Sequence, residues 1–200
     1  MDVSAYVQAV GYLGIFATVF VETGLLVGFF LPGDSLLIAV GLLAAAKKMQ
    51  LSLALPALLL GSVLGNNLGY YLGRRWGLPL LRRARLRPGD LERARRFMAR
   101  FGPLSLLIGP YVPVFRAVVP FLCGTVRMSW PRFFVLSFIG SLLWTQGLTL
   151  LAYYLGSKIP HLERYIYLIL LGGVGFAVLL AVWRAYRAGG LRWPGRSAAR

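Results

Sequence analysis

Long apolar stretches separated by short polar breaks make up most of the chain. Three of them are continuous and reach about the 20 residues that a helix needs to cross a bilayer: 51–73, 133–156 and 165–183. Two others, 10–46 and 103–128, are interrupted by proline and glycine, which break helices. We predict transmembrane helices for the continuous stretches. For the interrupted ones we predict helical hairpins that enter the membrane and turn back.

The composition agrees with an integral membrane protein. Hydrophobic residues make up 58% of the 200 residues and charged residues 14%, whereas soluble domains average about 25% charged residues. The mean hydropathy is +0.70. In a soluble protein a net charge of +16 would suggest a nucleic-acid partner, but this composition excludes soluble enzymes and nucleic-acid-binding modules. The single cysteine excludes an intrachain disulfide.

Most of the positive charge is confined to two segments. Ten of the 22 lysines and arginines lie in 74–102, where Asp90 and Glu92 alone oppose them, and five more lie in the tail, 184–200. A basic amphipathic helix is expected to begin near Asp90. Because positive charge flanking apolar spans marks the cytoplasmic side, both segments are expected in the cytoplasm, in contact with anionic lipid headgroups.

Two segments in different halves of the chain have related sequences. GSVL at 61–64 is followed by YYLG at 70–73, and GSLL at 140–143 by YYLG at 153–156. Chance similarity between apolar, glycine-rich segments is the alternative. With the basic segment in the cytoplasm, the two hairpins enter from opposite faces. We therefore predict an all-α integral membrane protein. Two opposed re-entrant hairpins and three to four transmembrane helices form one domain, 1–183, with the inverted repeat of secondary transporters.

Four charged residues lie inside the interrupted stretches: Glu22 and Asp34 in the first, and Arg116 and Arg127 in the second. A charge at membrane depth is costly, so each one marks a candidate functional site. Glu22 lies within an apolar run, where it either pairs with an arginine or takes up and releases protons. Asp34 alternatively caps the helix that follows it. Arg127 alternatively extends its long side chain to the membrane surface.

Arg116 lies at the second break, and its planar guanidinium is suited to bind the oxygens of a phosphate. The alternative is a structural ion pair with Glu22 or Asp34, and both roles hold if a substrate phosphate displaces the carboxylate. Asn66, an uncharged polar residue within an apolar span, completes the candidate transport residues. The chain has no metal-site spacing, nucleotide loop or nucleophile with a base, so we expect no metal, no cofactor and no enzymatic activity.

Three motifs resemble the signatures of the DedA membrane proteins, also called SNARE-associated or VTT-domain proteins. FFLPGDS at 29–35, with Glu22 before it, resembles the first signature. GNNLGYYLGRRWG at 65–77 looks like the second. PYVPVFRA at 110–117, followed by CGTVRM at 123–128, is similar to the third. The motifs occur in the family's order over roughly residues 10–160.

The resemblance implies a fold of opposed re-entrant hairpins and a role in moving lipids between leaflets. For a bacterial member it implies the cytoplasmic membrane, an undecaprenyl phosphate or phospholipid substrate, and dependence on the proton motive force. Glu22, Asp34 and Arg116 match the family's important acidic and basic positions. Two positions depart from the pattern, because Pro110 stands where the family commonly has arginine and Asn66 where it often has an acid.

We therefore expect a lipid transporter with membrane lipids and protons as partners, and we leave a homo-oligomer open. Arg116 would hold the phosphate of undecaprenyl phosphate or a related anionic lipid, while Glu22 and Asp34 would couple protonation to transport. A proton-coupled transporter of a small anion is one alternative, because it needs the same basic site and cavity. The other is a non-transporting scaffold for envelope proteins, motivated by the arginine-rich segment 74–102.

Overall fold

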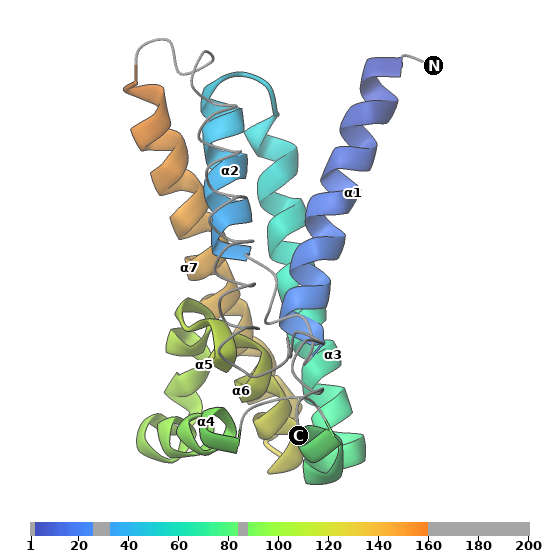
Figure 1. Cartoon of the computed structure of the whole chain (residues 1–200), viewed down its shortest axis with the longest axis vertical. Helices are drawn as coiled ribbons and strands as arrows, with labels where there is room; N and C mark the ends of the chain where they lie inside the picture. The colour runs from blue at the N-terminus through green and yellow to red at the C-terminus, as the bar shows by residue number, and fades with distance from the viewer. Residues whose placement is uncertain (1–2, 26–32, 84–87, 160–200) are drawn as a thin grey trace, which may run out of the picture.

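The computed structural model describes residues 3–25, 33–83 and 88–159, and all regular structure within these ranges is helical (Figure 1). The predicted helix 165–183 and the tail 184–200 lie outside the described residues. In chain order the elements are α1 (Val3–Gly24), α2 (Gly33–Ala45), α3 (Leu51–Arg83), α4 (Pro88–Phe101), η2 (Gly102–Leu104), α5 (Ser105–Ile108), η3 (Gly109–Tyr111), α6 (Pro113–Thr125) and α7 (Trp130–Ser157).

The two long helices α3 and α7 run most of the length of the molecule (Figure 1). Their apolar parts, Leu51–Gly77 and Trp130–Ser157, are long and apolar enough to cross a membrane. At 1.5 Å per residue each is about 40 Å long, which exceeds the roughly 30 Å of a bilayer core. These helices cover the predicted spans 51–73 and 133–156. However, α3 continues past residue 73 to Arg83, with a kink at Gly77, whose φ of 55° suits glycine.

The first interrupted stretch forms two helices that pack on different partners. Helix α1 packs mainly on α3 and α2 mainly on α7, with little contact between α1 and α2. The two helices are not paired along their lengths as the arms of a hairpin would be. They approach each other near the C-terminal end of α1 and the N-terminal end of α2 (Figure 1). The first helix, α1, has 22 residues and begins at Val3, before the predicted start of the stretch at residue 10.

The prolines of the second interrupted stretch divide it as predicted. Residues 102–111 form short turns of 3₁₀- and α-helix, η2, α5 and η3, with Pro103 and Pro110 in their first turns. Val112 is extended, and Pro113 then begins α6, which contains Pro120. Helix α5 packs on α7 and α6 packs on α3. The second stretch therefore occupies the opposite half of the molecule from α2 (Figure 1).

A stripe of glycines at every fourth position of α3 brings its neighbours close. A Cβ at Gly61 or Gly65 would press on the backbone of α1, and one at Gly73 would overlap the carbonyl of Phe121 in α6. Gly69, between them, has more room. Small residues at this spacing allow helix backbones to approach closely in membrane proteins. One face of α3 thus carries a helix of the first stretch and a helix of the second.

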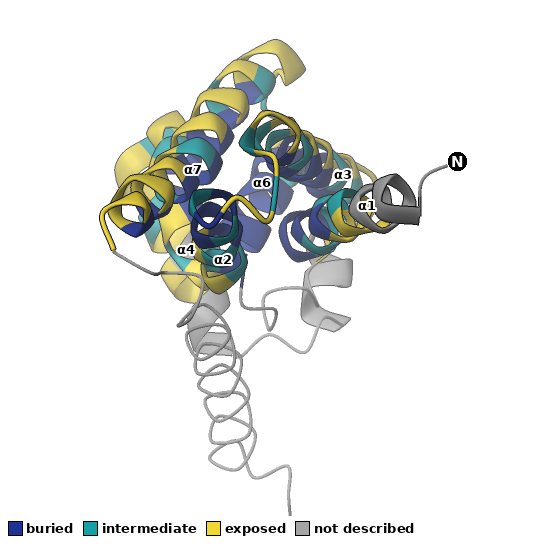
Figure 2. Cartoon of the chain, turned by 90° about the horizontal axis from the view of Figure 1, so that it is seen from above, coloured by how far each residue is buried: buried dark blue, intermediate teal, exposed yellow. Residues whose placement is uncertain are grey.

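The exterior of the long helices is apolar, whereas buried residues face the centre of the bundle (Figure 2). Large side chains such as Leu60, Leu64, Phe138 and Leu143 are exposed on α3 and α7. Exposed apolar surface of this extent is typical of faces that contact lipid or another protein. Exposed arginines gather on α4 and at Arg74 and Arg75 of α3, and Lys47 and Lys48 are exposed in the turn between α2 and α3.

Helix α4 is the predicted amphipathic helix. Its Phe97 packs on Phe115 of α6, with ring centroids 4.7 Å apart, while Arg95 and Arg96 are exposed. The helix begins at Pro88, two residues before Asp90, near which the sequence predicted its start. Proline is favoured at the first helical position because its missing N–H would have no partner there.

Candidate functional site

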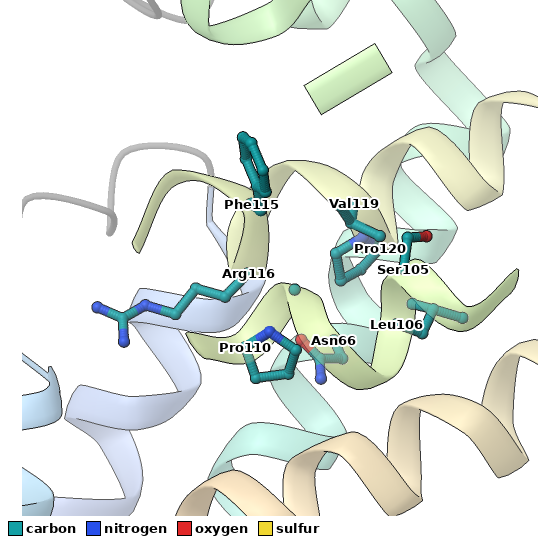
Figure 3. Close-up of a pocket in the computed structure, with 9 residues that line it drawn as sticks. Asn66, Ser105, Leu106, Pro110, Phe115, Arg116, Val119 and Pro120 are labelled. Carbon is teal, nitrogen blue, oxygen red and sulfur yellow. The ribbon is translucent and has the colours of Figure 1, made fainter. Parts of the chain in front are cut away.

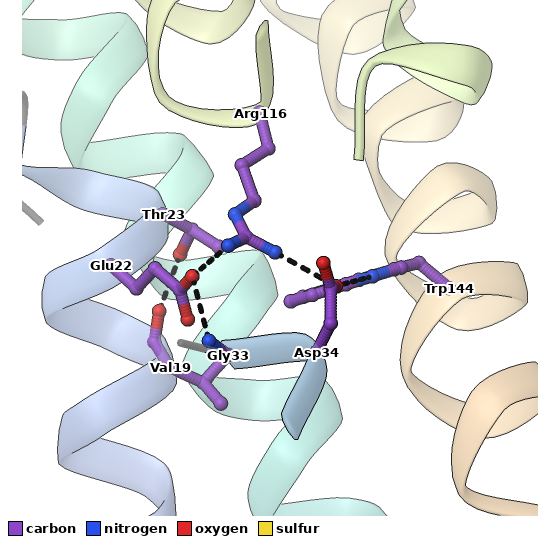
Figure 4. A network of polar contacts seen from close by, with 7 residues as sticks. All are labelled: Val19, Glu22, Thr23, Gly33, Asp34, Arg116 and Trp144. Atoms are coloured by element: carbon purple, nitrogen blue, oxygen red, sulfur yellow. Dashed lines mark hydrogen bonds and ion pairs between the residues drawn. The ribbon is translucent and has the colours of Figure 1, made fainter. Parts of the chain in front are cut away.

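Four helices meet near the middle of the molecule and bring charged side chains together (Figure 4). Helix α1 contributes Glu22 near its C-terminal end, and α2 contributes Asp34 in its first turn. Helix α6 contributes Arg116 in its first turn, and α7 contributes Trp144 from its middle. These four side chains are called the charge cluster below.

Arg116 links the two acidic residues. One terminal nitrogen forms an ion pair with Oε1 of Glu22, and the other, Nη1, donates to Oδ1 of Asp34 at 3.0 Å. The arginine side chain is only 3% exposed. The ion pair that the sequence allowed as an alternative is therefore present with both carboxylates at once, across segments 82 or more residues apart. A buried guanidinium without these partners would be strongly destabilising.

Glu22 also binds the N-terminal end of α2. Its Oε1 accepts the backbone N–H of Gly33 at 3.0 Å, so one carboxylate joins the end of α1 to the start of α2 and to α6. Glu22 is fully buried. A Cβ at position 33 would overlap the Glu22 carboxylate, so a larger residue there would require the carboxylate to move. Anionic groups are favoured at helix N-termini, which present unpaired N–H groups.

Asp34 and Trp144 complete the cluster on the α7 side. The indole Nε1 of Trp144 donates to Oδ1 of Asp34 at 3.0 Å. The guanidinium of Arg116 lies over the Trp144 ring, with its central carbon 5.1 Å from the ring centroid, which is a cation–π contact. Trp144 is 1% exposed, whereas the side chain of Asp34 is 42% exposed. Asp34 is therefore the accessible member of the charge cluster.

The charge cluster is not electrically balanced or fully hydrogen-bonded. When ionised, two carboxylates face one guanidinium. Oε2 of Glu22 and Nε of Arg116 are buried and have no hydrogen-bond partner within the described part of the chain. Buried polar atoms are nearly always paired, so unpaired atoms on a buried ion pair call for an explanation. An arrangement with an excess of acid can gain from taking up a proton or exchanging one partner.

Asn66 belongs to a second polar cluster, between α3 and α7. Its amide Nδ2 donates to Oγ of Ser141 at 3.0 Å, and Oγ of Ser62 also donates to Ser141, at 2.9 Å. All three side chains are buried. Ser62, Asn66 and Ser141 are called the neutral cluster below. They join the two long helices without using a charge.

Asn66 also lines a small pocket together with Pro110, Ser105 and Arg116 (Figure 3). The pocket has room for about one water molecule. The two positions that depart from the DedA pattern therefore lie on the same pocket, although they are 44 residues apart in sequence. The Arg116 side chain extends from this pocket toward α1 and α2 (Figure 3).

Arg127 lies apart from the other predicted site residues. It follows the C-terminal end of α6 in a left-handed conformation, with φ 55°, and its side chain is exposed. The eleven residues that separate it from Arg116 correspond to roughly 16 Å of helix. The structure thus brings together Glu22, Asp34 and Arg116, gives Asn66 a place at the neighbouring pocket, and leaves Arg127 at the surface.

Trp144 was not predicted as a site residue, yet it contacts both Asp34 of α2 and Arg116 of α6. Two signals were available. The residue lies in the middle of an apolar span, whereas tryptophan in membrane proteins concentrates at the interfaces. In addition, a buried indole N–H needs an acceptor, and acidic residues were predicted at the same depth.

Comparisons with known proteins agree with these motifs. The VTT domain family matches residues 31–158, which include Asp34, Arg116 and Trp144. The chain is similar to an uncharacterized membrane protein of Mycobacterium tuberculosis, with 34% identity over 183 residues, covering 88% of this chain and 80% of the relative. It is also similar to Protein DedA of Escherichia coli K12, with 31% identity over 176 residues, covering 86% of this chain and 80% of the relative. No solved structure matches the chain.

Proposed function

The chain belongs to the DedA family of VTT-domain membrane proteins, and from this premise we propose that it moves an anionic lipid between the leaflets of a membrane. The observation that carries the proposal is Arg116, a buried guanidinium held between the carboxylates of Glu22 and Asp34. Charges inside membrane domains are costly and mark substrate pathways. A guanidinium binds phosphate through two parallel hydrogen bonds. The substrate we propose is undecaprenyl phosphate or a related phospholipid.

The lipid phosphate would take the place of one carboxylate on Arg116. Asp34 is the better candidate for displacement, because it is 42% exposed and Glu22 is fully buried. Adding a phosphate to a cluster that already carries excess negative charge is unfavourable. Protonation of Glu22 or Asp34 would remove that excess, so proton uptake and phosphate entry would favour each other. This linkage is how we propose that transport is coupled to the proton motive force.

We further propose that the two interrupted stretches are re-entrant and related by an inverted repeat. Helices α2 and α6 have 13 residues each, or about 20 Å, which is too short to cross a bilayer core. The packing supports the repeat: α3 carries α1 and α6, and α7 carries α5 and α2. Within the described residues, exchanging α1, α2 and α3 with α5, α6 and α7, respectively, reproduces the same packing pairs. Helix breaks at membrane depth are tolerated where protein buries them.

For orientation, we propose the bacterial cytoplasmic membrane with α4 and the tail, 184–200, in the cytoplasm. The exposed arginines of α4 support this, because basic segments flanking spans stay inside. Cysteine labelling tests it directly, since Cys123, the single cysteine, is buried in α6. A thiol introduced by Arg96→Cys should react with a membrane-impermeant maleimide in inside-out vesicles and not in intact cells.

Reconstitution tests the transport function. Purified protein in liposomes is given labelled undecaprenyl phosphate or labelled phospholipid, and headgroup exposure is followed with and without a pH gradient. Translocation faster than in protein-free vesicles is expected. Equal rates in both kinds of vesicle would refute the lipid transporter. Uptake of radiolabelled phosphate in place of lipid would favour the small-anion transporter, and full function of Arg116→Ala in cells would favour the scaffold.

A further inference from the structure

Two N–H donors from different helices converge on one oxygen atom of the charge cluster. Nη1 of Arg116 in α6 and Nε1 of Trp144 in α7 each lie 3.0 Å from Oδ1 of Asp34 (Figure 4). Both donors belong to buried side chains, which are 3% and 1% exposed. Fixed donors aimed at one point from a buried frame are what proteins use to hold an oxyanion. The acceptor at that point is the carboxylate of Asp34.

The acceptor is less firmly enclosed than the donors. Asp34 has 42% of its side chain exposed and lies in the first turn of α2. The two donors, in contrast, are fixed against each other, because the Trp144 ring lies against the Arg116 guanidinium. That contact keeps the guanidinium plane in position whether or not Asp34 is bound. The donors are thus suited to keep their geometry while the acceptor changes.

We propose that Arg116 and Trp144 form a two-donor oxyanion site, which Asp34 occupies at rest and a phosphate oxygen of the substrate occupies after Asp34 leaves. This inference rests on the proposed function and assigns Trp144 a direct role in binding the substrate. Replacing one anionic oxygen by another leaves both donors paired, whereas removing Asp34 without replacement would leave two buried donors unpaired. The exchange therefore avoids an intermediate with unpaired buried donors.

The chemistry of the site selects a phosphate ester and rejects a neutral headgroup. A hydroxyl supplies no negative charge for the guanidinium, and hydrogen bonds to charged groups are roughly twice as strong as neutral ones. A lipid phosphate and free inorganic phosphate share the oxygens that the site recognises. They differ in the attached chain, so the experiment includes a probe of each kind.

The indole N–H of Trp144 reports on the site directly. The full chain, labelled with ¹⁵N-tryptophan in nanodiscs, is titrated with farnesyl phosphate, inorganic phosphate and farnesol, and the indole resonances are followed by NMR. Trp144→Phe identifies the Trp144 resonance. Trp130, whose indole donates to Asn67 at an exposed site, serves as the internal control.

Farnesyl phosphate is expected to shift the Trp144 resonance and leave that of Trp130 in place, while farnesol shifts neither. An equal response to inorganic phosphate also supports the oxyanion site and identifies free phosphate as its ligand. If farnesyl phosphate binding requires Arg116 but does not shift the Trp144 resonance, the inference is overturned. The proposed lipid transport is then unaffected. No binding of either phosphate also overturns it, and the liposome assay then decides the proposed function separately.

Two variants test the exchange by affinity. Asp34→Asn keeps an acceptor oxygen but removes the competing charge, so farnesyl phosphate should bind about tenfold more tightly. Trp144→Phe keeps the ring against Arg116 but loses the donor, so binding should weaken about tenfold, whereas Trp130→Phe should leave it unchanged. Weaker binding by Asp34→Asn, or unchanged binding by a folded Trp144→Phe, overturns the inference. If Trp144→Phe does not fold, the Asp34→Asn result decides.

Discussion

The charge cluster and the neutral cluster both include a buried side chain of α7, Trp144 in the first and Ser141 in the second, yet they are built in opposite ways. In the neutral cluster, Ser62 and Asn66 both donate to the hydroxyl of Ser141 over 2.9–3.0 Å. In the charge cluster, two acids share one arginine, and buried atoms of Glu22 and Arg116 have no hydrogen-bond partner among the described residues. The first arrangement is complete, whereas the second can accept a further partner.

The difference indicates which cluster holds the helices together and which one changes during function. Neutral hydrogen bonds between membrane helices each contribute about 0.6 kcal/mol on average. The neutral cluster therefore stabilises the packing of α3 on α7 modestly, and we expect it to persist during function. Buried ion pairs gain little over apolar packing, but removing one partner costs about 3–5 kcal/mol. Neutral hydrogen bonds would suffice if the residues at this depth only had to hold helices together. The charge cluster is therefore expected to be retained for transport.

The largest effect should follow the loss of Arg116. Arg116→Gln leaves the buried carboxylate of Glu22 and the partly exposed carboxylate of Asp34 without a counter-charge. Lipid translocation should therefore fall more than about 100-fold, with a loss of stability of about 3–5 kcal/mol. Translocation in liposomes and thermal unfolding in detergent measure the two effects. Arg116→Lys keeps the charge but not the planar fork, and it should recover stability more than transport. Transport by Arg116→Gln at the wild-type rate would show that the charge cluster, like the neutral cluster, only holds helices together.

Neutralising Glu22 should affect transport more than stability. In Glu22→Gln the amide oxygen can still accept the N–H of Gly33, and Asp34 still neutralises Arg116. Lipid translocation should fall about tenfold and lose its acceleration by a pH gradient, because one proton-accepting group is gone. Liposome assays with and without the gradient provide the measurement. An unchanged response to the gradient would show that Glu22 does not carry the proton.

A methyl group at position 33 should disturb the charge cluster without changing any charge. In Gly33→Ala the new Cβ would overlap the Glu22 carboxylate, so we expect a loss of about 1–3 kcal/mol and reduced translocation. Gly109→Ala is the matched control, because a Cβ there would make ordinary contacts of 3.7 Å or more. Thermal unfolding of both variants compares them. Equal effects at the two positions would argue against the observed contact between Gly33 and Glu22.

The smallest effect should come from the neutral cluster. Ser141→Ala removes the shared acceptor of Ser62 and Asn66, and we expect a loss of about 1 kcal/mol with translocation within about twofold of wild type. Unfolding and liposome assays on the same preparation separate the two quantities. If transport by Ser141→Ala fell as far as that of Glu22→Gln, the neutral cluster could not be distinguished from the charge cluster by its role in transport.

Local sequence patterns predicted some of the positions at which helices begin. Gly33 begins α2 and Pro113 begins α6, because the backbone preferences of glycine and proline act locally. Pro120, in contrast, lies inside α6, and α1 already ends at Gly24. An ion pair of Arg116 with Glu22 or Asp34 was the alternative to phosphate binding, and the structure shows this pair with both carboxylates. The role of Arg127, which is exposed beyond α6, remains a prediction.

The packing partners could not be read from the sequence, because they depend on residues far apart in the chain. The apolar pattern of 10–46 suggested two paired arms, yet α1 packs on α3 and α2 on α7. The glycine stripe of α3 explains this, since Gly61 and Gly65 let α1 approach more closely than a larger side chain would. Trp144 was missed for the same reason: its partner, Asp34, is 110 residues away.

The most direct test compares two lipids that differ only in the group that Arg116 would bind. Labelled undecaprenyl phosphate and labelled undecaprenol are placed in the same liposomes with wild-type protein or with Arg116→Gln. We expect the wild-type protein to accelerate movement of the phosphate lipid and not the alcohol, and the variant to accelerate neither. Equal acceleration of both lipids, or an undiminished phosphate rate in Arg116→Gln, would contradict a role for the charge cluster in carrying the phosphate.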